Sequence, residues 1–375
     1  MTKARELAKL GEVMTNSQIG GRRNIIINGA MQVAQRGTSF TSVSGSAYHL
    51  DRFRTGMGDT SARFTVTQAT SGLNGFPNSL KYDCTTAESS LSNADARLFV
   101  TQRIEGQDLQ QLKKGTSDAE KVTVSFYVKS TKTGTYILNL IDHDNNRQIS
   151  KSYTISSSGT WEQKILTFDA DTTGALDNDN ANSFSLNWHL IAGTNYSSGT
   201  LATSWQGYAG ASDYEDAAVG NVNLGDSTSN TWEITGIQLE VGEQATPFEH
   251  RSFGEELALC HRYFHFSGFP KIVPGQDQSD GGLVDYEGQI FSWTLGGSNR
   301  HGTSYSFPVK MRSNPAITMY GPVDGTSARS APYNSATQET VTEFFNESTN
   351  GLHGYFTCGS NTTGQRFFLD ADCEL

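Results

Sequence analysis

Hydrophobic and polar residues alternate over several short segments between residues 23 and 249, at the two-residue period of a half-buried β-strand. The segment Val122–Ser130 reads VTVSFYVKS, which places three valines and a phenylalanine on one face. Gly, Asn and Asp, which favour turns, separate such segments. The same alternation recurs at Thr135–Asp142, Arg147–Ile155, Trp161–Phe168, Ser183–Ile191 and Thr231–Val241. The pattern predicts an all-β fold whose main domain is a jelly-roll β-sandwich.

A further strand and two loops are predicted for the rest of this region. An apolar run predicts a short strand at Asn24–Asn28, just before a glycine. The region is longer than a minimal sandwich, so we expect Ser71–Asn93 and Thr194–Ser229 to be long loops at its ends.

Two segments have the 3–4 residue spacing of a helix. In residues 1–20, Leu7, Leu10 and Met14 share one face, which predicts an amphipathic helix of about three turns. A helix this short is marginal alone, so we expect it to attach the chain to another protein. After Pro247, the segment 253–264 predicts a second helix that presents Leu257 and His261.

Shorter strand patterns resume from residue 266 to the end of the chain, separated by turns rich in Gly, Ser and Asn. These patterns predict a second β-sandwich. The expected domains are therefore an N-terminal attachment helix and linker at 1–21, a jelly roll at 22–250, a helical neck at 251–265 and a distal β-sandwich at 266–375.

Composition excludes several classes of function. Charged residues make up only 18% of the chain and hydrophobic residues 35%, so Ser, Thr, Asn, Gln and Gly must form much of the surface. The net charge of −11 argues against a nucleic-acid partner, because phosphates require clustered Lys and Arg. No window approaches the roughly 18 consecutive apolar residues of a membrane span, so we expect no membrane insertion.

The cysteines and the N-terminal residues indicate in which cellular compartment the protein is synthesised. Cys84, Cys260, Cys358 and Cys373 are scattered without a CxxC pair, which predicts free thiols. Residues 1–13 lack the apolar core of a secretory signal, so we expect synthesis in a cytoplasm.

Several segments together resemble the tail-fibre and receptor-binding proteins of marine phages. They include RNIIINGAMQVAQRGTSF, RIEGQDLQQL, VSFYVKSTKTGTY, ITGIQLEVGEQATPFEHRSFGEELALCHRYF and FPVKMRSNPAIT. The resemblance covers nearly the whole chain after residue 20. It implies a jelly roll of the carbohydrate-binding-module type, a helical neck and a distal β domain, assembled as a homotrimer. The apolar stripes of the two predicted helices also favour a homotrimer.

The resemblance implies a virion structural protein, synthesised in the host cytoplasm and located on the tail or capsid surface. We expect the N-terminal helix to bind another virion protein and the distal domain to contact a host cell-surface glycan or protein without catalysis. A capsid decoration protein, such as a head fibre or knob, is the alternative.

A polysaccharide depolymerase is the second alternative, and the prediction is against an enzyme. Glycoside cleavage needs two carboxyl groups about 5–10 Å apart. The candidates are Glu240 with Glu243, Asp285 with Glu287, and the group Asp213, Glu215 and Asp216, none of which has a distinctive context. The chain also lacks the GxSxG and HExxH motifs.

Two oxygen-rich segments are candidates for a structural calcium ion, although no cofactor is required. Calcium prefers six to eight oxygen ligands. Asp142 and Asp144 lie in the sequence DHDNN, and Asp177 and Asp179 lie in DADTTGALDNDN. The first segment can also be a simple hairpin turn and the second a solvated loop, and neither follows the ligand spacing of an EF-hand.

Sugar binding typically uses aromatic rings as apolar platforms beside hydrogen-bonding groups. Trp188 alternates with Phe184 on a predicted strand, so we expect it in the core. The candidate contact rings at turns or in loops are Trp205 in the jelly roll and Trp293, Tyr320 and Tyr333 in the distal domain.

Overall fold

The computed structural model describes residues 23–208, 214–269, 289–295, 299–322, 327–332, 339–359 and 364–375. The helix predicted for residues 1–20 lies outside these residues. The described residues form two compact units. The first comprises residues 23–32, Thr38–Ser252 and Leu375, and the second comprises Val33–Gly37 and Phe253–Glu374. The helix expected as a separate neck belongs to the second unit.

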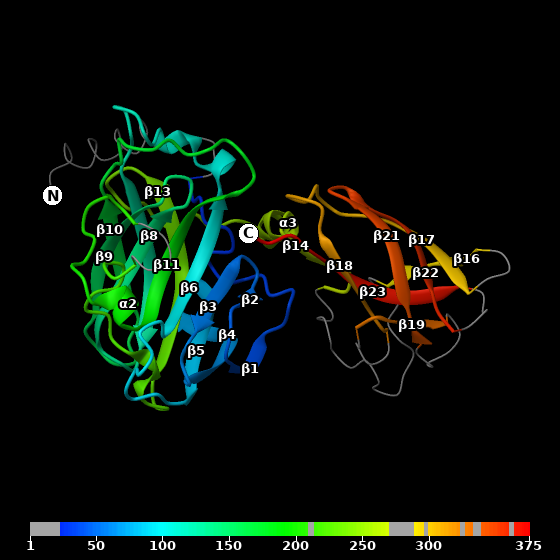
Figure 1. Cartoon of the computed structure of the whole chain (residues 1–375), viewed down its shortest axis with the longest axis horizontal. Helices are drawn as coiled ribbons and strands as arrows, with labels where there is room; N and C mark the ends of the chain where they lie inside the picture. Colours follow the sequence, from blue (N-terminus) through cyan, green and yellow to red (C-terminus); the bar gives the residue numbers. More distant parts are fainter. Residues whose placement is uncertain are drawn as a thin grey trace. The chain divides into compact units, whose positions relative to one another are not determined.

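The first unit consists of two antiparallel sheets (Figure 1). Sheet A has the order β1 (Ser39–Val43), β4 (Arg63–Leu73), β5 (Phe76–Thr86), β13 (Thr231–Val241), β7 (Val122–Ser130) and β10 (Glu162–Phe168). Sheet B has the order β12 (Gln206–Gly207), β9 (Arg147–Ile155), β8 (Gly134–Asp142), β11 (Asn182–Ala192), β6 (Arg97–Glu105), β3 (Phe53–Gly58) and β2 (Ala47–Leu50). The prediction of an all-β sandwich is confirmed, and strands β7, β9 and β13 begin and end at the predicted residues.

The core of this unit lies between the inner faces of the two sheets. Trp188 on β11 and Trp232 on β13 are both fully buried. The Phe126 ring on β7 packs edge-on against Trp188 with ring centroids 5.9 Å apart. Trp188 is therefore a core residue, as its alternation with Phe184 predicts. The same alternation turns Ser185, Asn187 and His189 to the outer face of sheet B.

Two local predictions in this unit are wrong. Residues 24–28 run beside β13 without forming a regular strand. The Asn24 side chain replaces backbone carbonyl groups as the hydrogen-bond acceptor. Its Oδ1 accepts from the amides of Ile26 at 3.0 Å and Leu239 at 3.1 Å. Ser71–Asn93 is also not a loop, since β4 and β5 form a hairpin in which Leu73 pairs with Phe76.

The segment Thr194–Ser229 is largely irregular, as predicted. It contains only the single-turn helix α2 (Thr194–Ser197), the two-residue strand β12 and the 3₁₀ turn η3 (Leu224–Asp226) among its described residues. Two further 3₁₀ turns, η1 (Gly106–Asp108) and η2 (Gln110–Leu112), follow β6.

The second unit is also built from antiparallel strands. One sheet contains β14 (Phe264–Phe266), β23 (Gln365–Asp372), β19 (Arg329–Pro332) and β20 (Glu339–Thr340), with β15 (Ile290–Phe291) and β18 (Ala316–Tyr320) also paired to β23. The other contains β16 (Trp293–Thr294), β17 (Arg300–Ser306), β22 (Gly351–Thr357) and β21 (Thr342–Ser348). Met311, Phe356 and Phe367 are fully buried in its core.

The helix predicted for 253–264 forms as α3 (Phe253–His261) and ends three residues early, because Phe264 begins β14. Glu256 and Cys260 are its buried residues, while Leu257 and His261 are half-buried. All four cysteines are buried free thiols. Among the described residues, no helix has the length and apolar character required to cross a membrane.

A glycine substitution tests the packing of the N-terminal segment. A Cβ at Gly29 would lie 2.1 Å from the backbone oxygen of Ile237 on β13, so Gly29→Ala should lower the free energy of unfolding by about 1–3 kcal/mol. Gly45→Ala is the matched control, because a Cβ there meets nothing within 4 Å. Denaturant unfolding followed by tryptophan fluorescence measures both, and equal stabilities would contradict the close contact.

Candidate functional site

A cleft of about 200 Å³ lies on the outer face of sheet B. Three neighbouring strands, β6, β11 and β8, form its floor, and residues of the 194–229 segment form one wall. We call it the sheet-B cleft. Its lining residues are Arg97, Phe99, Thr101, Arg103, Asn139, Ile141, His143, Ser185, Asn187, His189, Tyr196, Tyr214 and Ala217.

Strand register arranges the floor in rows that run across the strands. On the central strand β11, Asn187 lies directly opposite Thr101 of β6 and Asn139 of β8. One row along, Ser185 lies opposite Arg103 and Ile141, and in the other direction His189 lies opposite Phe99 and Ile137. Directly opposite residues in antiparallel strands share a face, with Cβ atoms about 5 Å apart. The central row of the floor is therefore wholly polar, and the rows on either side mix polar side chains with Ile141, Ile137 and Phe99.

Several polar atoms of this floor have no partner. Both ring nitrogens of His189, Oδ1 of Asn139 and Oγ1 of Thr101 are buried without a hydrogen bond in the part of the chain that the structure describes. Asn139 uses its amide nitrogen toward β9, donating to Ser150 Oγ at 2.9 Å, which leaves its oxygen unpaired. Buried polar groups almost always have partners, so these atoms indicate a site for ordered water or a polar ligand.

The two histidines of the cleft are held neutral. Burial lowers the pKa of His189 to about 4. Burial, together with the Arg103 charge, lowers the pKa of His143 to about 4, and the His143 ring pairs with Ser185 Oγ at 2.9 Å. A neutral imidazole has one donor nitrogen and one acceptor nitrogen. His189 can therefore accept from one ligand hydroxyl and donate to another.

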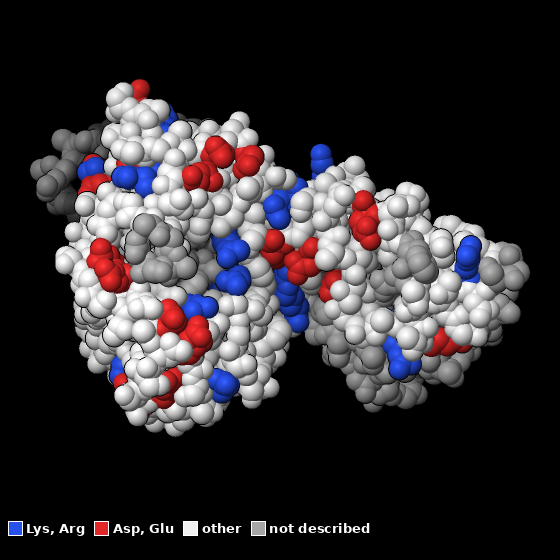
Figure 2. All heavy atoms as spheres, in the orientation of Figure 1, with Lys and Arg blue, Asp and Glu red and all other residues white. Residues whose placement is uncertain are grey.

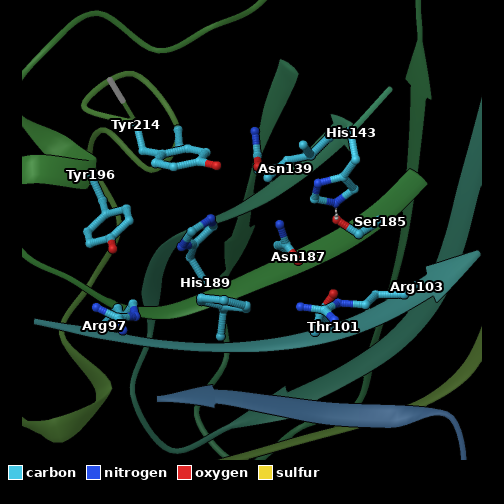
Figure 3. Close-up of a pocket in the computed structure, with 13 residues that line it drawn as sticks. Arg97, Thr101, Arg103, Asn139, His143, Ser185, Asn187, His189, Tyr196 and Tyr214 are labelled. Atoms are coloured by element: carbon cyan, nitrogen blue, oxygen red, sulfur yellow. Dashed lines mark hydrogen bonds between the residues drawn. The ribbon is translucent and has the colours of Figure 1, made fainter. Parts of the chain in front are cut away.

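Tyrosine rings form the wall of the cleft. Tyr196 on α2 and Tyr214 stack with ring centroids 6.1 Å apart, and Tyr208 packs against Tyr214 at 4.8 Å. Figure 3 shows His189 and Asn187 rising from the strand into the space between these rings and, at the other end, His143 and Arg103. Half-buried tyrosine rings beside polar groups are the usual surface for binding a sugar.

Two glycines on β3 leave space that side chains of the neighbouring strand β6 fill. A Cβ at Gly56 would lie 2.3 Å from the Phe99 ring, and a Cβ at Gly58 would lie 2.8 Å from the guanidinium of Arg97. Both side chains of β6 therefore lie over the backbone of β3. Phe99 and Arg97 thus border the sheet-B cleft on its β3 side.

Asp142, one of the predicted calcium ligands, forms an ion pair with a lysine. The Lys114 ammonium pairs with the fully buried Asp142 carboxylate and with Asp171 Oδ2 at 2.9 Å. It also donates to the carbonyl oxygens of Thr173 and Gly174 at 3.0 Å. Two carboxylates and two carbonyls thus surround an ammonium, and a calcium ion at Asp142 would have to displace it.

The charge of Asp171 is stabilised in this cluster. Burial alone would raise the pKa of its carboxyl group, but hydrogen bonds from Arg147 and Lys114 outweigh that effect and hold the pKa below its usual value. The cluster joins the turn after β8 to the segment that follows β10, which are the two segments where calcium was expected.

The other three predicted metal ligands are partly engaged. Asp144 Oδ2 accepts from the Asp177 amide at 2.9 Å, and Asp179 Oδ1 accepts from the Ala181 amide at 2.9 Å. Within the described parts of the chain, no three His, Cys, Asp or Glu side chains are grouped to hold a metal ion. The structure thus brings Asp142, Asp144 and Asp177 to one region, where the lysine supplies the positive charge.

Trp205, Trp293 and Tyr320, the predicted contact rings that the structure describes, are not among the lining residues of the sheet-B cleft. Trp205 is half-buried beside Lys114 and donates from Nε1 to the Asp169 oxygen at 2.7 Å. Tyr320 is also half-buried and donates to Asp370 Oδ2 at 2.7 Å. Trp293 is 53% exposed in the second unit, and Tyr333 lies outside the described residues. Of the three described residues, Trp205 belongs to the first unit, and Trp293 and Tyr320 belong to the second.

The described members of the carboxyl groups considered for glycoside cleavage, Glu240, Glu243, Glu215 and Asp216, are not among the lining residues of the cleft. Both oxygens of Glu240 accept from Thr246, and Glu243 pairs with Lys121 at 2.9 Å. Asp216 accepts from the Thr200 amide at 2.6 Å. Asp213, Asp285 and Glu287 lie outside the described residues. Among the described residues that line the sheet-B cleft there is no Asp or Glu.

The sequence contained a signal for the cleft that the analysis of aromatic residues missed. In SFSLNWHLI, the residues between the core positions are Ser185, Asn187 and His189, which form a polar face on a central strand. Phe99, Thr101 and Arg103 alternate in the same way on β6. Recognising that these two faces adjoin required the strand order, which the sequence does not reveal.

Comparisons with known proteins gave matches among solved structures only. No protein-family model matches the chain, and no curated protein does. The enzymatically active domain of tailspike protein 4 from bacteriophage CBA120 is similar over 58% of this chain at 13% identity and a TM-score of 0.30. The match covers 21% of that tailspike chain, so the likeness is to a small part of it.

Two other similar structures are sugar-binding proteins by description. A family 11 carbohydrate-binding module from Clostridium thermocellum, in complex with a mixed-linked tetrasaccharide, matches 55% of this chain and all of its own at 12% identity and a TM-score of 0.29. A sugar-binding protein described from Bacteroides thetaiotaomicron matches 58% of this chain and all of its own at 13% identity and a TM-score of 0.30.

The ion pairs of Lys114 with Asp142 and Asp171 predict an effect on stability. Lys114→Gln leaves two buried carboxylates without their ammonium, so it should lower the free energy of unfolding by about 3–5 kcal/mol. Lys113→Gln is the matched control, because its exposed ammonium pairs only with Glu120. Thermal unfolding of the full chain measures both variants, and equal losses would show that the cluster does not stabilise the fold.

The depressed pKa of His189 predicts a pH dependence. Below pH 6.5 the unfolded chain binds a proton at His189 that the folded protein binds only near pH 4, so the free energy of unfolding should fall as the pH drops across this interval. His189→Gln should flatten that slope by up to about 1.4 kcal/mol per pH unit. Asn187→Ala, which removes no titrating group, should leave the slope intact. Identical slopes in wild type and His189→Gln would contradict a neutral buried imidazole.

Proposed function

We propose that this protein is a non-catalytic glycan-binding protein and that the sheet-B cleft holds the sugar. The observation that carries the proposal is the group of unpartnered polar atoms on the cleft floor, at His189, Asn139 and Thr101 of neighbouring rows. Sugar hydroxyls both donate and accept hydrogen bonds, so they can satisfy a neutral imidazole, an amide oxygen and a threonine hydroxyl together. The tyrosine wall supplies apolar contact for the face of a sugar ring.

The cleft is suited to binding a short stretch of a glycan. Its volume of about 200 Å³ is below the roughly 300–1,000 Å³ of pockets that enclose a drug-sized ligand. On its β3 side the cleft is bordered by Phe99 and Arg97, whose side chains lie over the backbone of Gly56 and Gly58.

Binding without hydrolysis is supported by the chemistry of the floor. The described lining residues offer amides, hydroxyls, neutral imidazoles and guanidinium groups, and no carboxyl pair. Glycoside hydrolysis of the usual kind requires two carboxyl groups across the scissile bond.

The biological setting of the proposal rests on the sequence resemblance. The segments shared with marine-phage tail fibres and receptor-binding proteins support a protein of the virion that contacts a host-surface glycan. In this proposal three copies assemble on the particle, residues 1–20 attach them to another virion protein, and the first unit, rather than the distal one, contacts the host.

Substitutions in the cleft test the function. Asn187→Ala removes the central side chain of the polar row, and Tyr196→Ala removes a wall ring. Each should weaken binding of the full chain to a host-cell surface or to its purified surface polysaccharide by about 5- to 10-fold, the value of one or two lost hydrogen bonds or a ring contact.

Trp293→Ala serves as the control, because it removes a ring that is 53% exposed in the second unit. It should leave binding unchanged while near-ultraviolet circular dichroism shows all three variants folded. Loss of binding in Trp293→Ala alone would place the site in the second unit, and release of shortened oligosaccharides by the wild type would make the protein an enzyme.

A further inference from the structure

Three arginines share the outer face of β3 and β6 beside the sheet-B cleft. Arg54 on β3 lies directly opposite Thr101, the β6 member of the polar row. Arg103 lies two residues along β6 on the same face, and Arg97 lies opposite Gly58. Figure 2 shows Lys and Arg atoms gathered along the middle of this face, over β6 and β3, on a chain whose net charge is −11.

The three guanidinium groups differ in how far the protein itself satisfies them. Arg97 pairs with Asp59 Oδ2 at 2.7 Å. Arg103 donates to the main-chain oxygen of Leu375, the last residue of the chain, at 2.5 Å, and the Tyr48 hydroxyl donates to the same oxygen at 2.6 Å. Arg54 is half-buried, and among the described residues it makes no hydrogen bond and no ion pair. Burial and the charges of Arg103 and Arg97 lower the pKa of Arg54, and Tyr48, which lies opposite Arg54 on β2, partly opposes them.

Such an arrangement is unfavourable unless an anion completes it. A guanidinium that is partly removed from water normally has a carboxylate or other acceptor, because the desolvation of the charge must be offset. Here Arg54 lies on the β3 side of a polar cleft whose described lining contains no acid, with Arg103 at one end of the cleft and Arg97 at the other. An arginine fork binds the planar oxygens of a carboxylate, or those of a sulfate, through two parallel hydrogen bonds.

We infer that the glycan is acidic and that Arg54 and Arg103 hold a carboxylate or sulfate group of one sugar residue at the β3 side of the cleft. This inference rests on the proposed function and specifies its ligand class. The neighbouring sugar hydroxyls bind the row of Thr101, Asn187 and Asn139. Because Arg54 lies directly opposite Thr101, an anionic group can reach Arg54 while the same sugar contacts the polar row.

Matched charged and neutral polymers test the inference on the full chain. Polygalacturonate is compared with its methyl-esterified form, and dextran sulfate with dextran. The wild type should bind at least one charged polymer about 10-fold more tightly than its neutral counterpart, and more weakly as salt is raised. Preference for polygalacturonate identifies a carboxylate as the bound group, and preference for dextran sulfate identifies a sulfate.

Two variants that each remove one positive charge separate the site from general attraction. Arg54→Gln should lower the affinity for the charged polymer by about 10-fold. Lys81→Gln is the control, because Lys81 lies on β5 of sheet A and pairs with Asp83 at 2.8 Å. It should leave the affinity unchanged. Equal effects of the two variants, or no preference for either charged polymer, would overturn the inference.

The two proposals fail in different ways. If a neutral polymer binds and Asn187→Ala weakens that binding while Arg54→Gln does not, the cleft binds glycans but the ligand is not acidic. If no polysaccharide binds, or if Asn187→Ala has no effect on any that does, the proposed function fails as well.

Discussion

The placement of β11 at the centre of sheet B, in fixed register between β6 and β8, determines the rest of the first unit. Because side chains alternate along a strand, the register that buries Trp188 and Leu186 also sets Asn187 and His189 on the outer face. A slip of one residue would exchange the two faces and put the indole into the cleft. The Phe126 ring packs edge-on against Trp188 with ring centroids 5.9 Å apart, and the slipped register would lose this contact.

The outer face then carries an unusual combination of burial and unmet hydrogen bonding. Asn187 is 5% exposed and His189 is 4% exposed, so the 194–229 segment shields them from bulk water. Shielding makes hydrogen bonds to a ligand stronger, and it makes an unfilled polar site more costly. A lysine provides the corresponding compensation elsewhere in the unit, where Lys114 neutralises Asp142 and Asp171 from within the chain. Arg54 has no such internal partner among the described residues.

Much of the fold could be predicted from the sequence, because strands with one buried face have a strong two-residue period. Val122–Ser130, Arg147–Ile155 and Thr231–Val241 form strands at the predicted residues. One wrong prediction lies where a side chain replaces the backbone ladder, because Asn24 binds backbone amides in a segment that forms no regular strand. The other overlooked a signal that the sequence contains, because Asn74–Gly75, between the paired residues Leu73 and Phe76, is a typical two-residue hairpin turn.

The site was less accessible to sequence reasoning, for a physical reason. Each of its rows joins residues from β6, β8 and β11, which are 38 or more positions apart at their paired residues, such as Thr101, Asn139 and Asn187. Only the strand order brings them together. Aromatic residues in loops drew attention instead, although Trp205 and Tyr320 prove to have their polar atoms bonded within the protein.

A crystal structure of the full chain with a bound acidic oligosaccharide would test the central claim most directly. We expect the sugar on the outer face of sheet B, with hydroxyl groups within hydrogen-bonding distance of His189 and Asn187 and its acidic group at Arg54. An empty sheet-B cleft with the oligosaccharide bound at Trp293 in the second unit would contradict the account.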